Sequence, residues 1–464
     1  MNPLTQRFQQ VYFLGIGGIG MSALARYFRA AGLAVAGYDR TSTPLTDSLI
    51  EEGMEIHFQD SVEAIPSRYR DPLCVQHTLI IRTPAVPSGH SELNWFVNAG
   101  YTLMKRSEVL GLITQGQKTL AVAGTHGKTT TSSILAHLLQ RAGHNCTAFL
   151  GGISTNFGSN LLLGDPAGQN HEIVVEADEF DRSFLTLHPY GSVITSMDPD
   201  HLDIYGSESI MHDTYRSYAS QVSADGVLVV KEGLHLGETA ARQLSYGVDS
   251  HDTDYSARRI FIHDGNYCFD LHTPGFVLEG LKLGLPGRHN VENAVGACAL
   301  ALESGTDPGA IPSALATYSG VQRRFERHIS SGSTIYIDDY AHHPSEIRAA
   351  IGSARELFPE RRLTVVFQPH LFSRTRDFMQ EFADALSLAD NLYLLEIYPA
   401  RELPIAGITS SALLDCIGIQ HKQLIGRSEL LDRFRSEPPA LLLTLGAGDI
   451  DQLVQPLKTI LRHD

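Results

Sequence analysis

The sequence predicts an α/β protein of three domains, each built around a largely parallel sheet. A chain of 464 residues is too long for one ordinary domain and, at roughly 150 residues each, suffices for about three. Runs rich in β-branched residues alternate with helical patterns almost throughout, as they do where helices connect parallel strands. Polar residues follow these strands directly, at the edge where open parallel sheets bind ligands. We expect domains at residues 1–117, 118–325 and 326–464.

The first domain begins with alternating strands and helices. VYFLGIG at 11–17 is predicted to be a strand, followed by a helix over about 18–31 and the strand LAVAGYD. A further helix is predicted at 44–52, and HTLIIRTPAV at 77–86 is predicted to be a strand that ends in a proline-containing loop. The polar segment TQGQK then closes the domain.

The first loop of this domain, GIGGIG, has the glycine spacing of the dinucleotide-binding fingerprint. Glycine lets the backbone approach a diphosphate at the start of the next helix, where free N–H groups favour anions. An acid follows the second strand, where the fingerprint places a ribose contact. A dinucleotide and a UDP-sugar both fit this pattern, and so does a packing turn without a ligand. The candidate contacts are Gly15, Gly17, Gly18, Ile19, Gly20 and Asp39.

The second domain starts with strand, loop and helix in KTLAVAGTHGKTTTSSILAHLLQRAG. The loop can wrap its N–H groups around a phosphate, Lys128 can reach the terminal phosphate oxygens, and the Thr129 hydroxyl can ligate Mg²⁺. Val122 stands where the usual pattern has its first glycine, but GKTTT directly after a strand favours a phosphate loop over a capped turn. The predicted nucleotide contacts are Gly124, Thr125, His126, Gly127, Lys128, Thr129 and Thr130.

Acids and one histidine follow the next two buried strands, EIVVEADEF at 172–180 and SVITSMD at 192–198. Carboxylates beside a phosphate loop suit a divalent cation that also binds nucleotide oxygens, although solvated acids at strand ends are the alternative. From these groups we select Glu176 and His201, together with Thr129, as Mg²⁺ ligands. The unselected acids are Asp178, Glu179, Asp181, Asp198, Asp200 and Asp203. A helix at 289–305 ends the domain.

The third domain contains four strand-to-loop transitions, in STIYIDDYAHHPSEIRAAI, LTVVFQPH, NLYLLEIYPA and ALLLTLGAGDI. Histidines and arginines follow its first two strands, in DDYAHHP and QPHLFSRTR. A guanidinium can bind a carboxylate through two parallel hydrogen bonds. A lone histidine or arginine is more often structural, but two such clusters after consecutive strands favour a carboxylate site.

Composition limits the classes of partner. A net charge of −16 argues against general binding of nucleic acid or anionic membranes, which needs a broad basic surface. The five cysteines lack a CxxC pair, so we expect free thiols in a reducing compartment. No run of about 18 apolar residues occurs. We therefore expect a cytoplasmic protein without nucleic-acid or membrane partners, as a monomer or weak homodimer.

Eight motifs resemble those of the Mur ligases, in the same order along almost the whole chain. They are GIGGIGMSALA, AGTHGKTTT, VVEADEFDRSF, DPDHLDIYG, LPGRHNVENAVGA, RRFE, DDYAHHPSEI and FQPHLFSRT. The resemblance implies a Rossmann-like UDP-sugar domain, a central P-loop ATPase domain and a C-terminal Rossmann-like domain that brings the amino acid. It is strongest to members that join L-alanine to UDP-N-acetylmuramate through an acyl phosphate in peptidoglycan synthesis, which implies these two substrates, with ATP and Mg²⁺ as cofactors.

The resemblance also implies residue roles. The residues expected around the adenine, ribose and phosphates are Asn290, Asn293, Arg324, Asp338 and Asp339. Those expected to act on the carboxylate and the alanine amine are His343, His370 and Arg374, with Lys128 on the phosphates. The GIGGIG loop is then expected to bind the diphosphate of a UDP-sugar. The chain departs from the family pattern at Ser196, where Thr-Asn is common, and at Leu371, where arginine is.

Other functions compete with this one. A recycling ligase that attaches a preformed peptide to the same UDP-sugar typically has a cysteine in the first loop, which is absent here. An NAD(P)-dependent oxidoreductase leaves GKTTT unexplained, and a nucleotide-gated binding protein leaves the histidines and arginines of the third domain without a role. We expect the domains to close on substrates, with a hinge at 320–330 that contains Arg323 and Arg324.

Overall fold

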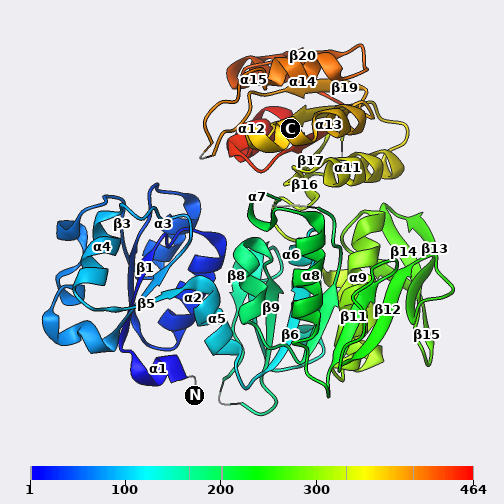
Figure 1. The fold of residues 1–464 in the computed structure, drawn as a ribbon. Coiled ribbons are helices and arrows are strands. Elements are labelled where there is room, and N and C mark those ends of the chain that lie inside the picture. The colour runs from blue at the N-terminus through cyan, green and yellow to red at the C-terminus, as the bar shows by residue number, and fades with distance from the viewer. Residues whose placement is uncertain (1–2, 167, 200–201, 331, 401, 463–464) are drawn as a thin grey trace. The chain divides into compact units, whose positions relative to one another are not determined.

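The structure, a computed structural model, describes residues 3–166, 168–199, 202–330, 332–400 and 402–462. Three sheets follow one another along the chain, with five, ten and six strands (Figure 1). This three-domain α/β architecture confirms the predicted fold class. The boundaries predicted at 117 and 325 fall between strands of successive sheets and stay predictions.

The backbone separates into two compact units. The first consists of Met1–Arg259, Asp270–Leu281 and Glu292–Tyr318, and it holds the whole five-stranded sheet. The second consists of Ile260–Phe269, Lys282–Val291 and Ser319–Asp464, and it holds the whole six-stranded sheet.

The first sheet is parallel, in the order β3-β2-β1-β4-β5. Alternate residues of β1 enter two cores, with Val11 and Phe13 on the α2 side and Tyr12 and Leu14 on the α4 side. Each predicted element is present and ends earlier than predicted. The strands are β1 Gln10–Leu14, β2 Ala34–Tyr38, β3 Glu55–His57, β4 Thr78–Arg82 and β5 Thr102–Lys105. The helices are α1 Pro3–Arg7, α2 Ile19–Ala30, α3 Pro44–Glu51, α4 Ser91–Asn98 and α5 Arg106–Thr114, with 3₁₀ helices Val62–Ala64, Ser67–Tyr69 and Pro72–His77.

The second sheet has the order β15-β14-β13-β12-β11-β10-β6-β9-β7-β8. Its neighbours β10, β6 and β9 are parallel and mostly buried, as their apolar runs predicted. Strands β7, β8 and β11 to β15 were not predicted. Exposed residues interrupt the apolar pattern of β12, β13 and β15. The strands are β6 Lys118–Ala123, β7 Cys146–Ser154, β8 Ser159–Leu162, β9 Glu172–Ala177, β10 Gly191–Ile194, β11 Val227–Lys231, β12 Arg242–Val248, β13 Tyr255–His263, β14 Asn266–His272 and β15 Val277–Leu283. The helices are α6 Lys128–Arg141, α7 Leu202–Tyr205, α8 Glu208–Ala219, α9 Arg288–Glu303 and α10 Ile311–Thr317, with 3₁₀ helices Phe180–Thr186 and Pro308–Ala310.

The third sheet has the order β16-β17-β21-β18-β19-β20, with β16 antiparallel to β17 and the other four pairs parallel. Alternate residues of β17 again enter two cores, with Ile335 and Ile337 on the α11 side and Tyr336 on the α16 side. All four predicted strand-to-loop transitions are present. The strands are β16 Glu326–Ile329, β17 Ile335–Asp339, β18 Leu363–Phe367, β19 Asn391–Leu394, β20 Lys422–Leu424 and β21 Leu441–Leu445. The helices are α11 Pro344–Leu357, α12 Phe372–Asp377, α13 Met379–Leu386, α14 Ser410–Cys416, α15 Arg427–Ser436 and α16 Val454–Leu461, with the 3₁₀ helix Asp449–Leu453.

A buried carboxylate in β9 joins segments far apart in the central domain. Glu172 Oε1 lies 2.7 Å from Lys118 Nζ, at the start of β6, and accepts a 2.9 Å hydrogen bond from Ser304 Oγ, directly after α9. Glu172 Oε2 lies 2.9 Å from His144 Nδ1. Burial acts to raise the pKa of Glu172, but these hydrogen bonds outweigh it and the pKa is lowered. The carboxylate therefore stays charged where it is buried.

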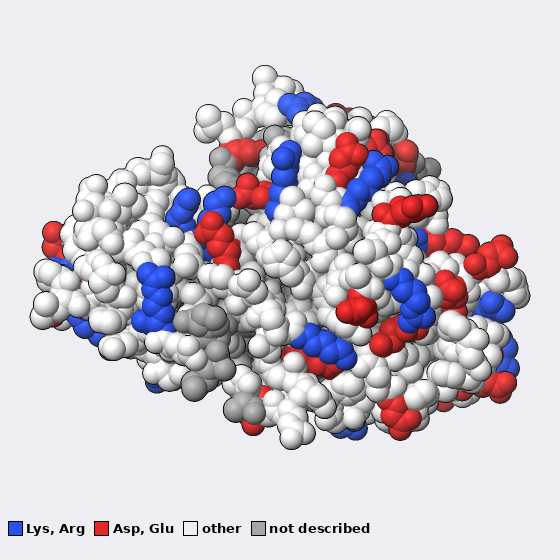
Figure 2. All heavy atoms as spheres, turned by 60° about the horizontal axis from the view of Figure 1, so that its bottom comes forward, with Lys and Arg blue, Asp and Glu red and all other residues white. Residues whose placement is uncertain are grey.

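The charged surface residues and the cysteines can be compared with what the composition predicted. Acidic and basic side chains are interspersed on the face that Figure 2 presents. All five cysteines are free thiols. In the parts of the chain that the structure describes, no helix is long and apolar enough to cross a membrane.

A buried polar network lies beneath α4 in the first domain. The Tyr12 hydroxyl donates to Glu92 Oε2 at 2.6 Å and lies 2.7 Å from His57 Nε2. Glu92 is fully buried, and this burial raises its pKa to about 7. Because the folded pKa lies above the unfolded value, the contribution of Glu92 to stability is present at low pH and is lost as the pH rises through about 7.

We expect Glu92→Gln to stabilise the first domain relative to the wild type as the pH rises from 5 to 8, by on the order of 2 kcal/mol. His57, His90 and Asp60 also face this network. Burial lowers the pKa of both histidines below the usual 6.5, so both imidazoles are neutral at pH 8 in either protein. The single tryptophan, Trp95, lies on α4 and reports unfolding of this domain. Urea unfolding followed by its fluorescence measures the difference, and a pH-independent value would contradict the burial of an ionisable Glu92.

Candidate functional site

The phosphate loop joins β6 to α6 at the centre of the second sheet. Gly124 has φ 138° and Gly127, which precedes the first residue of α6, has φ 82°, both in the region that favours glycine. A Cβ atom at Gly124 would also lie 2.1 Å from Thr195 Oγ1. Glycine therefore fits at position 124 both in conformation and in volume, and the predicted order of strand, glycine loop and helix is confirmed.

Residues that follow β10 form hydrogen bonds with the phosphate loop. Ser196 Oγ accepts the N–H of His126 at 2.7 Å and lies 2.9 Å from Thr125 Oγ1. Thr125 Oγ1 accepts the N–H of Asp198 at 3.0 Å. Ser196, a departure from the family pattern, thus supports the loop, while the nucleotide contacts of Thr125 and His126 stay predictions.

Lys128 is paired with a buried carboxylate. Its Nζ lies 2.7 Å from Glu179 Oε2 and donates to Gly124 O at 2.6 Å. Burial alone would lower the pKa of Lys128, but Glu179, Glu176 and Asp178 outweigh it and raise the pKa. Burial raises the pKa of Glu179, and the neighbouring Lys128 acts against that rise. Because an opposite charge and a hydrogen bond at this distance favour the ionised forms, we take the pair as charged.

Glu176 and Thr129, two of the predicted Mg²⁺ ligands, lie beside the loop. Glu176 Oε2 is buried without a hydrogen-bond partner among the described residues, and Thr129 is buried in the first turn of α6. A carboxylate oxygen in this state suits Mg²⁺, which takes oxygen ligands and usually keeps water or phosphate oxygens. Within the described residues no group of three His, Cys, Asp or Glu side chains forms a metal site. His201 lies outside those residues, and the three-ligand assignment stays a prediction.

The GIGGIG loop joins β1 to α2, as predicted, and Asp39 holds its shape. Gly15 has φ 88°, and Gly18 donates to Gly15 O at 3.3 Å. Asp39 Oδ2 accepts the N–H of Gly17 at 2.6 Å. This contact gives Asp39 a structural role, and its contact with a uridine stays a prediction.

The first turn of α2 retains free hydrogen-bond donors. The N–H groups of Ile19 and Gly20 have no acceptor among the described residues. A helix start with unpaired donors attracts anions. This is the part of the loop that suits a diphosphate.

The two asparagines predicted around the adenine lie on α9. Asn293 is buried, and its Oδ1 would lie 2.6 Å from a Cβ at Gly127, so the amide packs against the phosphate loop. Asn290 belongs to the second compact unit and donates from Nδ2 to Pro286 O at 2.6 Å. The structure brings Asn293 to the loop, and adenine contacts of both residues stay predictions.

Asp338 and Asp339, at the end of β17, stabilise the predicted hinge segment. Asp339 Oδ2 accepts the N–H of Phe325 at 2.7 Å, and Asp338 Oδ2 lies 3.1 Å from Arg323 Nε. Arg323 and Phe325 have φ 59° and 51°, values that non-glycine residues rarely adopt. Both carboxylates therefore hold a strained connection, and burial raises the pKa of Asp339 to about 7. Their contacts with ribose and phosphates stay predictions.

A carboxylate that was not predicted, Glu346, organises the DDYAHHP loop. It accepts the N–H of His342 at 3.0 Å and that of His343 at 3.3 Å, at the start of α11. Its Oε1 lies 3.9 Å from Arg324 Nη1, and the Arg324 guanidinium lies 5.2 Å from the Tyr340 ring centre. Arg324 thus has neighbours in its own unit, and its ribose contact stays a prediction.

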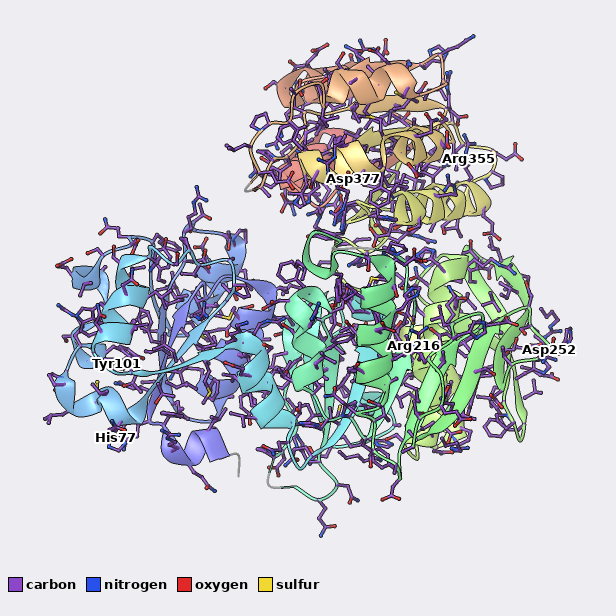
Figure 3. All side chains as sticks on the ribbon, viewed as in Figure 1. His77, Tyr101, Arg216, Asp252, Arg355 and Asp377 are labelled. Atoms are coloured by element: carbon purple, nitrogen blue, oxygen red, sulfur yellow. The ribbon has the colours of Figure 1, made fainter. Side chains whose placement is uncertain are left out.

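The histidines of the third domain gather at the ends of β17 and β18. His343 is the cap residue of α11, and the His370 ring is 6.1 Å from that of His342. Burial lowers the pKa of His342 to about 4, so this imidazole is neutral. Leu371, with φ 72°, precedes α12, which carries Arg374. In Figure 3, the labels Arg355 and Asp377 mark α11 and the end of α12. The carboxylate roles of His343, His370 and Arg374 stay predictions.

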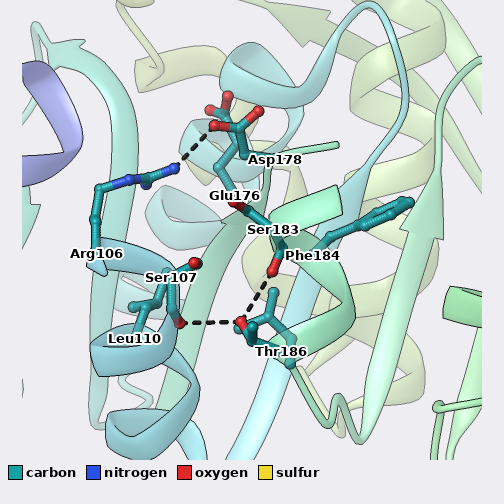
Figure 4. A pocket seen from close by; sticks show the side chains of 9 residues that line it. Arg106, Ser107, Leu110, Glu176, Asp178, Ser183, Phe184 and Thr186 are labelled. Carbon is teal, nitrogen blue, oxygen red and sulfur yellow. Dashed lines mark hydrogen bonds and ion pairs between the residues drawn. The ribbon is translucent and has the colours of Figure 1, made fainter. Parts of the chain in front are cut away.

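Sequence reasoning missed three charged residues at the centre of the site. Glu179 and Asp178 were among the acids after β9 but were not selected, although a buried lysine requires a nearby counter-charge. Arg106 lies outside all eight motifs. It begins α5, and its Nη2 donates to Asp178 Oδ2 at 2.9 Å (Figure 4). Only the folded chain brings residues this far apart together.

The fold and the site define a nucleotide-binding α/β protein with a phosphate loop on a parallel sheet. Three family models match successive parts of the chain. They are the catalytic domain of the Mur ligase family at residues 10–118, the Mur ligase middle domain at 122–301 and the Mur ligase glutamate ligase domain at 323–448. The chain belongs to the Mur ligase family.

Individual relatives match over almost their whole length. The UDP-N-acetylmuramate–L-alanine ligase of Porphyromonas gingivalis is 50% identical over 458 residues, which cover 98% of this chain and 99% of the relative. The ligase of the same name from Flavobacterium johnsoniae is 47% identical over 459 residues, covering 99% of each chain. The crystal structure of the UDP-N-acetylmuramate-alanine ligase from Thermotoga maritima has a TM-score of 0.79 and 27% identity, covering 97% of this chain and 98% of that one.

We expect Gly124→Ala to lower the stability of the central domain by about 2–4 kcal/mol, because strain at positive φ and a steric clash add. The matched control is Gly143→Ala, at the other end of α6. Gly143 has φ 83° but no atom within 4 Å of an added Cβ, so about 1 kcal/mol is expected there. Thermal unfolding by calorimetry compares the two, and equal shifts would show that the contact with Thr195 does not matter.

Replacing Lys128 by Met leaves the buried Glu179 carboxylate without its counter-charge, and we expect a loss of about 3–5 kcal/mol. The double variant Lys128→Met/Glu179→Gln removes both charges and should regain most of that loss. Hydrogen exchange of the amides in α6 measures the stability of both variants. A double variant no more stable than the single one would refute the ion pair.

Proposed function

We propose that this chain joins L-alanine to the lactyl carboxylate of UDP-N-acetylmuramate, with ATP converted to ADP and phosphate. The observation that carries the proposal is its 47–50% identity over almost the whole chain to UDP-N-acetylmuramate–L-alanine ligases. The phosphate loop with its buried lysine supports the use of ATP. The product, UDP-N-acetylmuramoyl-L-alanine, would be a peptidoglycan precursor made in the cytoplasm.

Activation of the carboxylate is the step that requires ATP. A carboxylate is a poor acyl donor at neutral pH because its leaving group would be oxide, whereas an acyl phosphate expels phosphate. Phosphoryl transfer depends mainly on positioning and on stabilising charge. Lys128 supplies a positive charge at the phosphate loop and would pass from Glu179 to the terminal phosphate. The alanine amine then attacks the acyl carbon, and the tetrahedral intermediate loses phosphate.

The remaining predicted residues take roles around this reaction. Glu176 and Thr129, with His201, would hold Mg²⁺, which when bound neutralises charge on the transferred phosphoryl group. The GIGGIG loop would bind the substrate's diphosphate at the start of α2. In the third domain, His343, His370 and Arg374 would bind the lactyl carboxylate and position the alanine amine.

Phosphate release by the full chain tests the proposal, with ATP, Mg²⁺, UDP-N-acetylmuramate and one acceptor at a time. We expect release that depends on L-alanine and is weaker with glycine or L-serine. The variant Lys128→Met/Glu179→Gln should lower kcat at least about 100-fold because it loses charge stabilisation of the transferred phosphoryl. Phosphate release with a preformed peptide but not with alanine would favour a recycling ligase. Phosphate release with neither would refute the proposal.

A further inference from the structure

Arg106 lies between the glycine loop of the first domain and the acidic loop after β9. A Cβ atom at Gly20 would be 2.7 Å from Arg106 Nη1, so the guanidinium rests directly against the first turn of α2. On its other side, Arg106 Nη2 donates to Asp178 Oδ2 at 2.9 Å (Figure 4). One guanidinium therefore reaches from the predicted diphosphate loop to the acids beside the phosphate loop.

A small pocket, with a volume of about 10 Å³ that suits roughly one water molecule, adjoins this ion pair. Its walls include Arg106 and Leu110 from α5 and Glu176, Asp178 and Phe184 from the central domain. Figure 4 shows Arg106, Glu176 and Asp178 at the same end of it. One basic and two acidic side chains thus line the pocket, between the glycine loop of the first domain and the loop after β9.

We infer that Arg106 binds the diphosphate of the UDP-sugar at the start of α2, and that Asp178 is its resting partner in the ligand-free protein. The inference rests on the proposed function for the identity of the substrate. Arginine presents five N–H donors in a planar fork, which suits two phosphate oxygens at once. Its side chain is 23% exposed and that of Asp178 is 37% exposed. An ion pair this exposed stabilises little, so exchanging the carboxylate for a phosphate costs little.

The neighbouring residue provides a matched control. Lys105 Nζ lies 3.0 Å from Asp181 Oδ2, so this pair also connects the start of α5 with the acidic loop. Both side chains of that pair are 41% exposed. If Arg106 served only to hold the two domains together, loss of Asp178 would have the same effect as loss of Arg106.

Calorimetric titration of the full chain with UDP-N-acetylmuramate, without ATP or Mg²⁺, tests the inference. We expect Arg106→Ala to weaken binding about 10- to 100-fold, as loss of a charge-assisted contact to phosphate does. Lys105→Ala should stay within about threefold of the wild type. Asp178→Asn frees the guanidinium and should bind the UDP-sugar as tightly as the wild type or more tightly. A second titration with UDP and with uridine should show that Arg106→Ala weakens only the diphosphate ligand.

Two results would overturn the inference. If Arg106→Ala and Asp178→Asn weaken binding of the UDP-sugar equally, the ion pair only holds the two domains together. If Arg106→Ala weakens binding of UDP and of uridine equally, Arg106 does not contact the diphosphate. The proposed function fails separately. A wild-type chain that binds the UDP-sugar but releases no alanine-dependent phosphate refutes ligation alone, whereas a chain that binds no UDP-sugar refutes both.

Discussion

The parallel register of three neighbouring strands is the constraint on which the candidate site depends. Strands β10, β6 and β9 pair without offset, so that Ile194, Ala123 and Ala177 lie level at one edge of the sheet. The phosphate loop, the brace at Ser196 and the acids after β9 all begin within a few residues of that edge. A shift of one strand by a residue would turn its side chains to the other face and separate these groups.

Two ion pairs characterise the candidate site. Lys128 pairs with Glu179, and Arg106 pairs with Asp178. The two pairs differ in burial, because the side chains of the first are 12% and 2% exposed and those of the second 23% and 37%. The first pair keeps a desolvated ammonium charged and in place, whereas the second can open at little cost. In both pairs a carboxylate from the loop after β9 holds the basic group in place.

The sequence predicted most of the architecture because its central strands are continuous apolar runs and because GKTTT and GIGGIG are local patterns. Strands β7, β8 and β11 to β15 were not predicted, and exposed residues interrupt such runs in β12, β13 and β15. Within the site, Gly124 and Lys128 were predictable from spacing alone. The partner of Lys128, the brace at Ser196 and the contact between Asp39 and Gly17 depend on which segments meet after folding, and no spacing records that. Apart from His201, which lies outside the described residues, the remaining residue roles rest on family resemblance.

The environment of Glu172 has a consequence for how the chain folds as it is synthesised. Its carboxylate is neutralised by Lys118, where the chain enters the central domain, and is hydrogen-bonded by Ser304, where α9 has just ended. An emerging chain cannot complete this contact until residue 304 has left the ribosome, well after the phosphate loop has been made. The central domain should therefore reach its final stability only late in translation, with segments near its two ends adjacent, an arrangement that also suits domain insertion and circular permutation.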